Sequence, residues 1–366
     1  MKTRLFITTV LFFWFAISAS AQSVGEFKPK EYKLNGANKF KSKDVYIANF
    51  SVNFQLYNLK TATTKGDFTG RMLTGDTKAS LAVGLDVPIA TLQEITDEAY
   101  QKFVQDLQAK GFNVLNGDAA AKTQFYEGYQ RMERMEMSLL EAPGMLTVYP
   151  TDAVFYVKGF TKDGKKIQGG ISATLNRAMN DDGRNSIVDE ISKYPKLSDE
   201  LDNATIVNAD LYVLFLDVKK PYQGNGARII ANTNLRLASY EHIDSRVSKA
   251  GGSGSKEKQY LCVSAIDFVQ GRNKIGGSPL GVYGGLLKED LLIKEVIGQE
   301  EIQSYAKSDQ DYIGVETGFG MMYRADNISV ENTAVIKADA AKYGKGAKEA
   351  INLFLEHHVK QFEKKF

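Results

Sequence analysis

The chain has 366 residues, of which 46 are basic and 44 acidic, giving a formal net charge of +2. Hydrophobic residues make up 43% and charged residues 25%, a balance that excludes a disordered chain, a collagen-like fibre and a protein with many membrane helices. A nucleic-acid-binding protein normally carries a basic excess, so nucleic acid is not an expected partner.

Residues 1–21 have the layout of a secretory signal peptide. Two basic residues precede an apolar run over 5–17, and small residues then place the cleavage between Ala21 and Gln22. The run is shorter than the roughly 20 apolar residues that a membrane helix needs, although an uncleaved anchor helix is the alternative. We therefore predict an exported protein, periplasmic or extracellular. No Cys follows the cleavage site, so we predict no lipid anchor.

The mature chain is predicted to have an N-terminal arm followed by one domain. Residues 22–43 are polar and basic and contain Gly and Pro, which is typical of an extended arm. Residues 44–366 are long enough for a single large domain with insertions. A Gly-, Ser- and Lys-rich stretch at about 246–258 predicts a flexible loop within it.

Alternation of apolar and polar residues predicts a strand over 45–59, with one bulged residue near Asn49, and a second strand over 81–87. Together they predict a long hairpin over about 50–88 with a polar tip. The apolar residues that alternate along both strands, called here the apolar phase, share one face of the hairpin. This face either packs on the protein's own core or, in a ring of subunits, contacts lipid; we expect it to pack on the core. That phase comprises Val52, Phe54, Leu56, Leu81, Val83 and Leu85.

Two amphipathic helices are predicted to pack on the sheet. The first spans 96–110, with Thr96 as its N-cap and Gly111 just past its end. The second spans 347–363. Their apolar stripes comprise Ala99, Phe103, Val104 and Leu107 in the first, and Ala350, Ile351, Phe354, Leu355 and Phe362 in the second.

Further elements complete the predicted fold. Residues 118–140 and 286–302 favour helices, and 211–218 form an apolar run typical of a strand buried on both faces. Strands are also predicted over 229–240 and 260–269. The predicted fold class is therefore α+β: a mixed β-sheet flanked by helices, with a long β-hairpin insertion.

No catalytic, cofactor-binding or metal-binding residue is identified, and no cofactor is predicted. Cys262 lies in an apolar run and is predicted to be a buried, inert thiol. His357 and His358 are adjacent, so they point in different directions on a helix and predict a solvated face rather than a metal site. Only His242 is left for a histidine-dependent mechanism.

Two loops invite a ligand-binding interpretation that their residues do not support. Residues 180–189 resemble a calcium loop, but Ala178 occupies the first ligand position and Asp189 replaces the final Glu. Residues 276–285 are glycine-rich but lack the spacing of a phosphate or dinucleotide loop. We predict a polar loop in the first and a turn with glycines at positive φ in the second.

The order of the predicted elements resembles that of a known type of domain. A strand is followed by a helix that ends in Gly-Phe-x-Val-Leu at 111–115, and later by an apolar strand introduced by Ala209-Asp210. This resembles the periplasmic α/β domain of the curli secretion channel lipoprotein family and the amino-terminal domain of the Tol-system propeller protein, over 44–58 and 94–270. The resemblance implies that 50–88 is a membrane-inserting hairpin. The chain departs from the curli family because it lacks the lipidated Cys.

These observations favour a non-catalytic, secreted or periplasmic envelope protein that acts through contacts with an envelope protein or a glycan. Homo-oligomeric assembly and membrane contact are options within that hypothesis, with membrane contact the less favoured. Two alternatives stay open. One is an envelope hydrolase with paired carboxylates, which need no local spacing. The other is an outer-membrane channel-like assembly with inserted hairpins.

Overall fold

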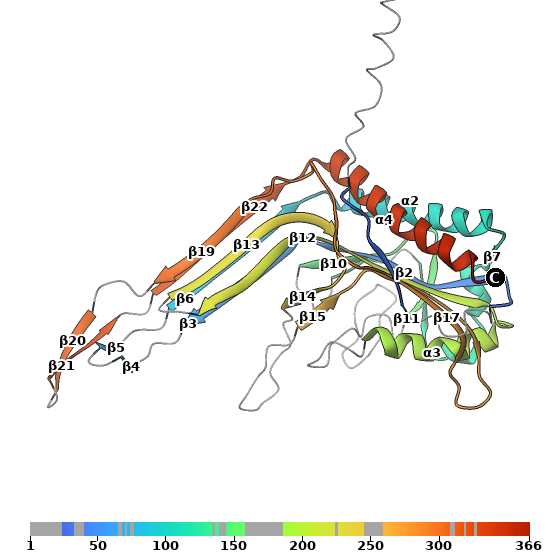
Figure 1. The fold of residues 1–366 in the computed structure, drawn as a ribbon, viewed down its shortest axis with the longest axis horizontal. Helices are drawn as coiled ribbons and strands as arrows, with labels where there is room; N and C mark the ends of the chain where they lie inside the picture. The colour runs from blue at the N-terminus through green and yellow to red at the C-terminus, as the bar shows by residue number, and fades with distance from the viewer. Residues whose placement is uncertain are drawn as a thin grey trace, which may run out of the picture.

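The computed structural model describes residues 24–32, 40–64, 68–69, 72–73, 77–133, 136–138, 144–157, 186–223, 226–244, 259–307, 312–317, 320–325 and 328–366. The predicted signal peptide with its cleavage site Ala21–Gln22, the loop at 246–258 and the polar loop at 180–185 lie outside the described residues. The described chain forms an α+β head from which a long β-arm projects (Figure 1).

A mixed sheet forms the centre of the head, as the sequence predicts. Its two central strands, β2 (Asp44–Gln55) and β12 (Thr205–Gln223), run parallel to each other. Antiparallel neighbours then extend the sheet to both sides in the order β1-β17-β16-β12-β2-β10-β9. Those neighbours are β16 (Ala265–Arg272), β17 (Pro279–Leu287), β1 (Pro29–Tyr32), β10 (Met145–Val148) and β9 (Glu136–Ser138), while β7 (Asn113–Val114) adds to the end of β2.

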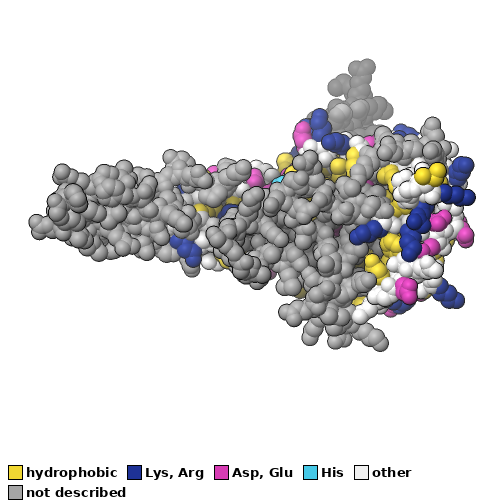
Figure 2. All heavy atoms as spheres, turned by 90° about the horizontal axis from the view of Figure 1, so that it is seen from below, with side chains coloured by type: hydrophobic (Ala, Val, Ile, Leu, Met, Phe, Trp, Pro, Cys, Tyr) yellow, Lys and Arg dark blue, Asp and Glu magenta, His cyan; other side chains and the backbone are white. Residues whose placement is uncertain are grey.

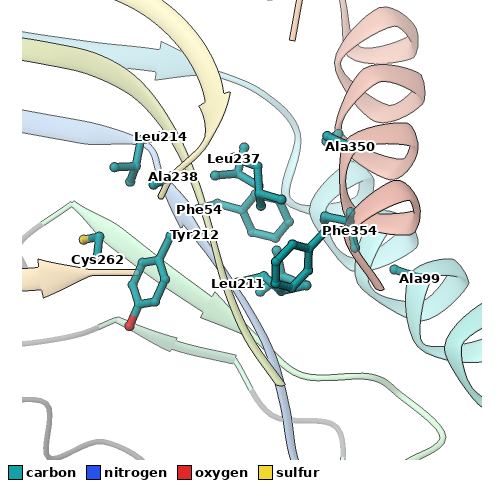
Figure 3. Packing of buried hydrophobic residues seen from close by; sticks show 14 of the residues in the cluster. Phe54, Ala99, Leu211, Tyr212, Leu214, Leu237, Ala238, Cys262, Ala350 and Phe354 are labelled. Atoms are coloured by element: carbon teal, nitrogen blue, oxygen red, sulfur yellow. The ribbon is translucent and has the colours of Figure 1, made fainter. Parts of the chain in front are cut away.

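Helices cover both faces of this sheet. The helices α2 (Ile89–Ala109) and α4 (Ala340–Glu363) lie on one face and α3 (Ser186–Glu200) on the other (Figure 1). The predicted stripes of α2 and α4 are buried, with Val104 alone among them half-buried. Figure 3 shows Phe54 of β2 between Leu211 and Leu237, on the side of the sheet from which Ala350 and Phe354 of α4 approach. The α+β prediction is therefore confirmed.

Both helix starts differ from the predictions. Helix α2 begins at Ile89, so Thr96 is not its N-cap; the Thr96 hydroxyl lies inside the helix and donates to the Leu92 carbonyl at 2.9 Å. Helix α4 begins at Ala340, where Asp339 accepts from two backbone N–H groups as a cap. The predicted end of α2 is confirmed, because Gly111 has a φ of 78°.

The helices predicted at 118–140 and 286–302 are wrong. The first region holds two short 3₁₀ turns, η2 (Gly117–Ala120) and η3 (Gln124–Tyr126), and then β8 (Gln130–Glu133), which pairs with β11 (Val154–Val157). The second holds the end of β17, β18 (Leu291–Leu292) and the start of β19 (Glu301–Lys307). Positive φ angles at Gly128 and Glu295 interrupt any helix, and strand pairing overrides weak helix propensity.

The arm consists of two layers of strands. One layer is a three-stranded sheet of β3 (Tyr57–Thr64), β6 (Thr77–Asp86) and β22 (Ile328–Lys337). The other is formed by the far half of β12, β13 (Gly226–Leu237) and β19. Short strands β4 (Phe68–Thr69), β5 (Met72–Leu73), β20 (Tyr312–Thr317) and β21 (Gly320–Ala325) pair at the tip, while β14 (Glu241–Asp244) and β15 (Gln259–Cys262) pair beside the head (Figure 1).

The arm has an apolar interior of its own. Buried side chains alternate along its strands, so one face of each layer points inward. Many of these side chains are small, which lets the two layers approach closely. The inward-facing side chains are Ala62, Ala79, Leu81, Val83 and Leu85 from one layer and Ala227, Ile229 and Ala231 from the other.

The predicted hairpin over 50–88 is two separate units. The chain breaks at Leu56, where the backbone N–H groups of Leu56 and Tyr57 both donate to the Gly144 carbonyl, at 2.8 and 3.2 Å. Only 57–86 forms the hairpin β3–β6, and β2 belongs to the head. Gly144 has a φ of 85°, and a Cβ there would overlap the Tyr57 carbonyl.

Two details of the strand prediction are confirmed. Ile47 pairs with Val207 and Asn49 with Asn208, so Ala48 is the extra residue of a bulge next to Asn49. The apolar phase is buried inside the protein except for the half-buried Leu56, with Phe54 in the head and Leu81 and its neighbours in the arm.

Two glycines in α4 offer a matched test of how closely that helix approaches its neighbours. A Cβ on Gly346 would overlap Cγ2 of Ile293, a stiff, β-branched and buried side chain. A Cβ on Gly344 would meet only Cγ2 of Thr91, at an ordinary 3.5 Å. We expect Gly344→Ala to stabilise the protein by up to about 1 kcal/mol through helix propensity, and Gly346→Ala to destabilise it by about 1–3 kcal/mol. Denaturant titrations measure both, and equal effects would contradict the packing of α4.

Candidate functional site

One face of the central sheet is polar where the other is apolar. Along β2, Phe50, Val52 and Phe54 face α2 and α4, and polar side chains alternate with them on the opposite face. Figure 3 shows the same division, with Tyr212 of β12 on the other side of the strands from Phe54. Because buried polar groups need hydrogen-bond partners, this face is the first candidate site. Its β2 members are Asn49, Ser51, Asn53 and Gln55.

Asp210 of β12 lies at the centre of this polar face. Its Oδ1 accepts from the Ser51 hydroxyl at 2.6 Å and from the Asn53 amide at 2.5 Å. Its Oδ2 accepts from the Tyr212 hydroxyl at 3.2 Å, and Asn53 in turn accepts from the Thr147 hydroxyl at 2.5 Å. These bonds join β10, β2 and β12 on one face, and they hold the Asp210 carboxylate in a fixed orientation.

A second carboxylate, Asp267 of β16, belongs to the same face. The strand register places Tyr32, Gly284, Asp267, Asn208 and Asn49 side by side across β1, β17, β16, β12 and β2. The Tyr32 ring crosses above Gly284, where a Cβ would overlap it, and its hydroxyl donates to Oδ1 of Asp267. Glycine at position 284 is therefore what allows the tyrosine of β1 to reach β16.

Asp210 and Asp267 are diagonal neighbours on adjacent antiparallel strands, because Asp267 pairs with Asn208. Diagonal positions of this kind place side chains about 7–8 Å apart. This pair is not predictable from the sequence, although Asp210 directly precedes the apolar run of β12. An acid next to an apolar run indicates a buried polar contact but does not identify its partner.

The root of the arm is the second candidate site. Oε1 of Gln55 accepts from the backbone N–H groups of Phe215 and Leu216, both at 3.2 Å, where β12 bulges against β13. The fully buried Arg236 of β13 binds Glu241 at 3.0 Å and Asp290 at 2.9 Å. Burial raises the pKa of Glu241, and Arg236 opposes that shift. These contacts set the direction in which the arm leaves the head.

The outer face of the arm exposes apolar side chains. Tyr57 and Leu59 of β3 are each 39% exposed, and Val335 of β22 is 66% exposed. The register places Tyr57 and Val335 on either side of Gly84 of β6, so two larger side chains flank a residue that has none. Exposed apolar groups on a projecting element are suited to contacts with another molecule.

The histidines do not share a site. His242 is exposed on β14, with its ring against Tyr240. His358 is fully buried between α4 and β17, so the predicted solvated face is wrong for this residue. Nε2–H of His358 donates to the Leu286 carbonyl at 3.2 Å, and Nδ1 accepts from the Tyr283 hydroxyl at 2.8 Å. Gly285 makes room for the ring, since a Cβ there would overlap it.

Burial of His358 predicts acid sensitivity. Desolvation, with a smaller effect of neighbouring His357, lowers the pKa of His358 to about 3 from an ordinary 6.5. Between pH 6.5 and about 3, His358 is protonated in the unfolded chain but neutral in the folded chain. The free energy of unfolding therefore falls as the pH falls, by up to about 1.4 kcal/mol per pH unit. We expect this part of the slope to disappear in His358→Gln, measured by denaturant titrations from pH 7 to 4. The control His357→Gln should change the slope less, and equal slopes for wild type and His358→Gln would contradict the assignment.

The predicted thiol and the predicted glycine-rich turn are both found in the structure. Cys262 is fully buried, as predicted, and Gly276 and Gly277 have φ angles of 83° and 68° in the turn between β16 and β17. Within the described ranges, no three His, Cys, Asp or Glu side chains are grouped as metal ligands would be. Among the helices that the structure describes, none combines the length and apolar character needed to cross a membrane.

Acidic and basic side chains are interspersed over the head in the view of Figure 2, in keeping with the near-neutral net charge. Compared with known proteins, the chain matches no family model, no curated protein and no solved structure. The resemblance to the curli channel and Tol-system domains therefore stays a prediction from the order of elements.

Proposed function

We propose that the protein is a non-catalytic envelope protein that is exported to the periplasm or cell surface and acts by self-association through its β-arm. The observation that carries the proposal is the outer face of the arm, where Tyr57, Leu59 and Val335 are exposed on a layered element with its own interior. Exposed apolar side chains on a projecting element do not stabilise the fold, so a contact with another molecule is the role that suits them. Contacts with another envelope protein or a glycan are the other outcomes of the test.

The experiment compares two charged variants of the mature chain by mass in solution. Leu59→Glu with Val335→Glu places charge on the outer face of the arm. Tyr240→Glu with Ile275→Glu adds the same charge at exposed positions of the head, 57% and 87% exposed. We expect wild type and the head variant to associate in a concentration-dependent way and the arm variant to stay a protomer. A wild type that is a protomer at every concentration would contradict self-association.

The hydrolase alternative has one observation in its favour, the pair Asp210 and Asp267. Paired carboxylates about 5–10 Å apart perform glycoside hydrolysis, and the strand register is compatible with that range. The hydrogen bonds from Ser51 and Asn53 also explain Asp210 as a structural anchor. Cleavage of envelope glycan by the mature chain, lost in both Asp210→Asn and Asp267→Asn, would favour the hydrolase.

The channel-like alternative requires a rearrangement of the arm. The apolar phase of Leu81, Val83 and Leu85 would have to face lipid, whereas these side chains face the arm's interior in this structure. The two layers would need to separate and expose that interior. Self-association through the outer face requires no such change, which is why we favour it.

A further inference from the structure

The edge of the central sheet at β17 is closed by residues 24–32, named here the N-terminal strap. Val24 is buried and bridges to Ile293, and the Gly25 N–H donates to the Leu292 carbonyl at 2.7 Å. Strand β1 at the end of the strap then pairs antiparallel with β17. The strap is thus an integral outer strand of the head rather than a free tail.

Side chains of the strap also contact both faces of the sheet. Phe27 packs edge-on against His357 of α4, with ring centroids 5.3 Å apart. Lys28 binds Glu289 at 2.7 Å on the β17–β18 connection. On the other face, Tyr32 crosses Gly284 to reach Asp267. The docked strap therefore ties α4, β17 and the polar face together.

The predicted cleavage site is immediately next to this buried strand. Cleavage after Ala21 leaves only Gln22 and Ser23 ahead of the buried Val24. A protease requires an accessible segment of chain on both sides of the bond that it cuts. From the end of the apolar run at Ile17, an extended chain also spans at most about 25 Å to Val24, so a docked strap would hold the head against the membrane.

We propose that the strap docks only after signal cleavage, so that the outer edge of β17 is an acceptor site for the new N-terminus of the same chain. In the uncleaved precursor the β17 edge is open, Tyr32 is away from Asp267, and Phe27 is away from α4. Closing the sheet is then the last folding step and depends on processing. The inference rests on the proposed export of the protein.

Backbone hydrogen exchange tests the proposal at a single amide. The Lys288 N–H donates to the Lys28 carbonyl at 2.8 Å, so its protection reports the docked strap. We compare the mature chain from Gln22 with a full-length precursor in which Ala21→Arg blocks cleavage. The Lys288 amide should exchange at least about tenfold faster in the precursor. Amides of β16, on the other side of β17, should exchange equally in both and serve as the control.

Substitutions in the mature chain test the docking contact separately. Gly284→Ala should expose the Lys288 amide, because its Cβ overlaps the Tyr32 ring. Adding Tyr32→Ala removes that overlap and should restore protection, which distinguishes a blocked strap from a misfolded sheet. Equal Lys288 protection in precursor and mature chain, or unchanged protection in Gly284→Ala, would overturn the proposal. A native N-terminal mass with Met1 intact would instead contradict the export on which it rests.

Discussion

Phe54→Arg should unfold the head rather than affect a membrane contact. Phe54 is fully buried in β2, between the sheet and the side chains of α4 (Figure 3). Truncating a buried Phe costs about 3–5 kcal/mol, and moving a guanidinium out of water adds to that loss, so we expect about 5 kcal/mol or more. Thermal melting measures the effect directly.

Tyr57→Arg is the matched control for this prediction. It introduces the same charge three positions later, on the exposed outer face of the arm, and should change stability by no more than about 0.5 kcal/mol. Neither variant nor wild type is expected to sediment with liposomes. A Phe54→Arg protein that melts like wild type but loses liposome binding would contradict the placement of β2 in the head.

Phe103→Ala should be the most damaging truncation in α2. The Phe103 ring is fully buried, and its centroid lies 5.7 Å from that of Phe50 on the sheet. We expect a loss of about 3–5 kcal/mol in a denaturant titration. Val104→Ala, the next residue on the half-buried flank, should cost clearly less. A loss below about 1 kcal/mol for Phe103→Ala would show that the assigned face of α2 is wrong.

Features that depend on local periodicity are predictable from the sequence. The stripe containing Phe103 and Leu107 repeats at helical spacing, and the bulge at Ala48 follows from a change of phase along β2. Gly111 is predictable as well, because a residue with positive φ commonly ends a helix.

Features that depend on distant contacts are not predictable in this way. The break at Leu56 is set by the carbonyl of Gly144, which approaches from another part of the chain. Burial of His358 depends on the missing side chain of Gly285, and the polar face depends on the register that brings Asp267 beside β12. The N-terminal strap belongs to a segment, 22–43, that is polar and basic in sequence, and only its pairing with β17 makes the strap part of the sheet.

Crosslinking between arms in cells tests the proposed self-association most directly. Val335→Cys, in a chain with Cys262→Ala, places one accessible thiol on the outer face of the arm. Ile275→Cys in the same background places it on the head, at a more exposed position. After treatment of intact cells with a thiol-specific bifunctional reagent, we predict a species of twice the protomer mass for Val335→Cys and little for Ile275→Cys. Equal crosslinking of the two variants, or none in either, would contradict assembly through the arm.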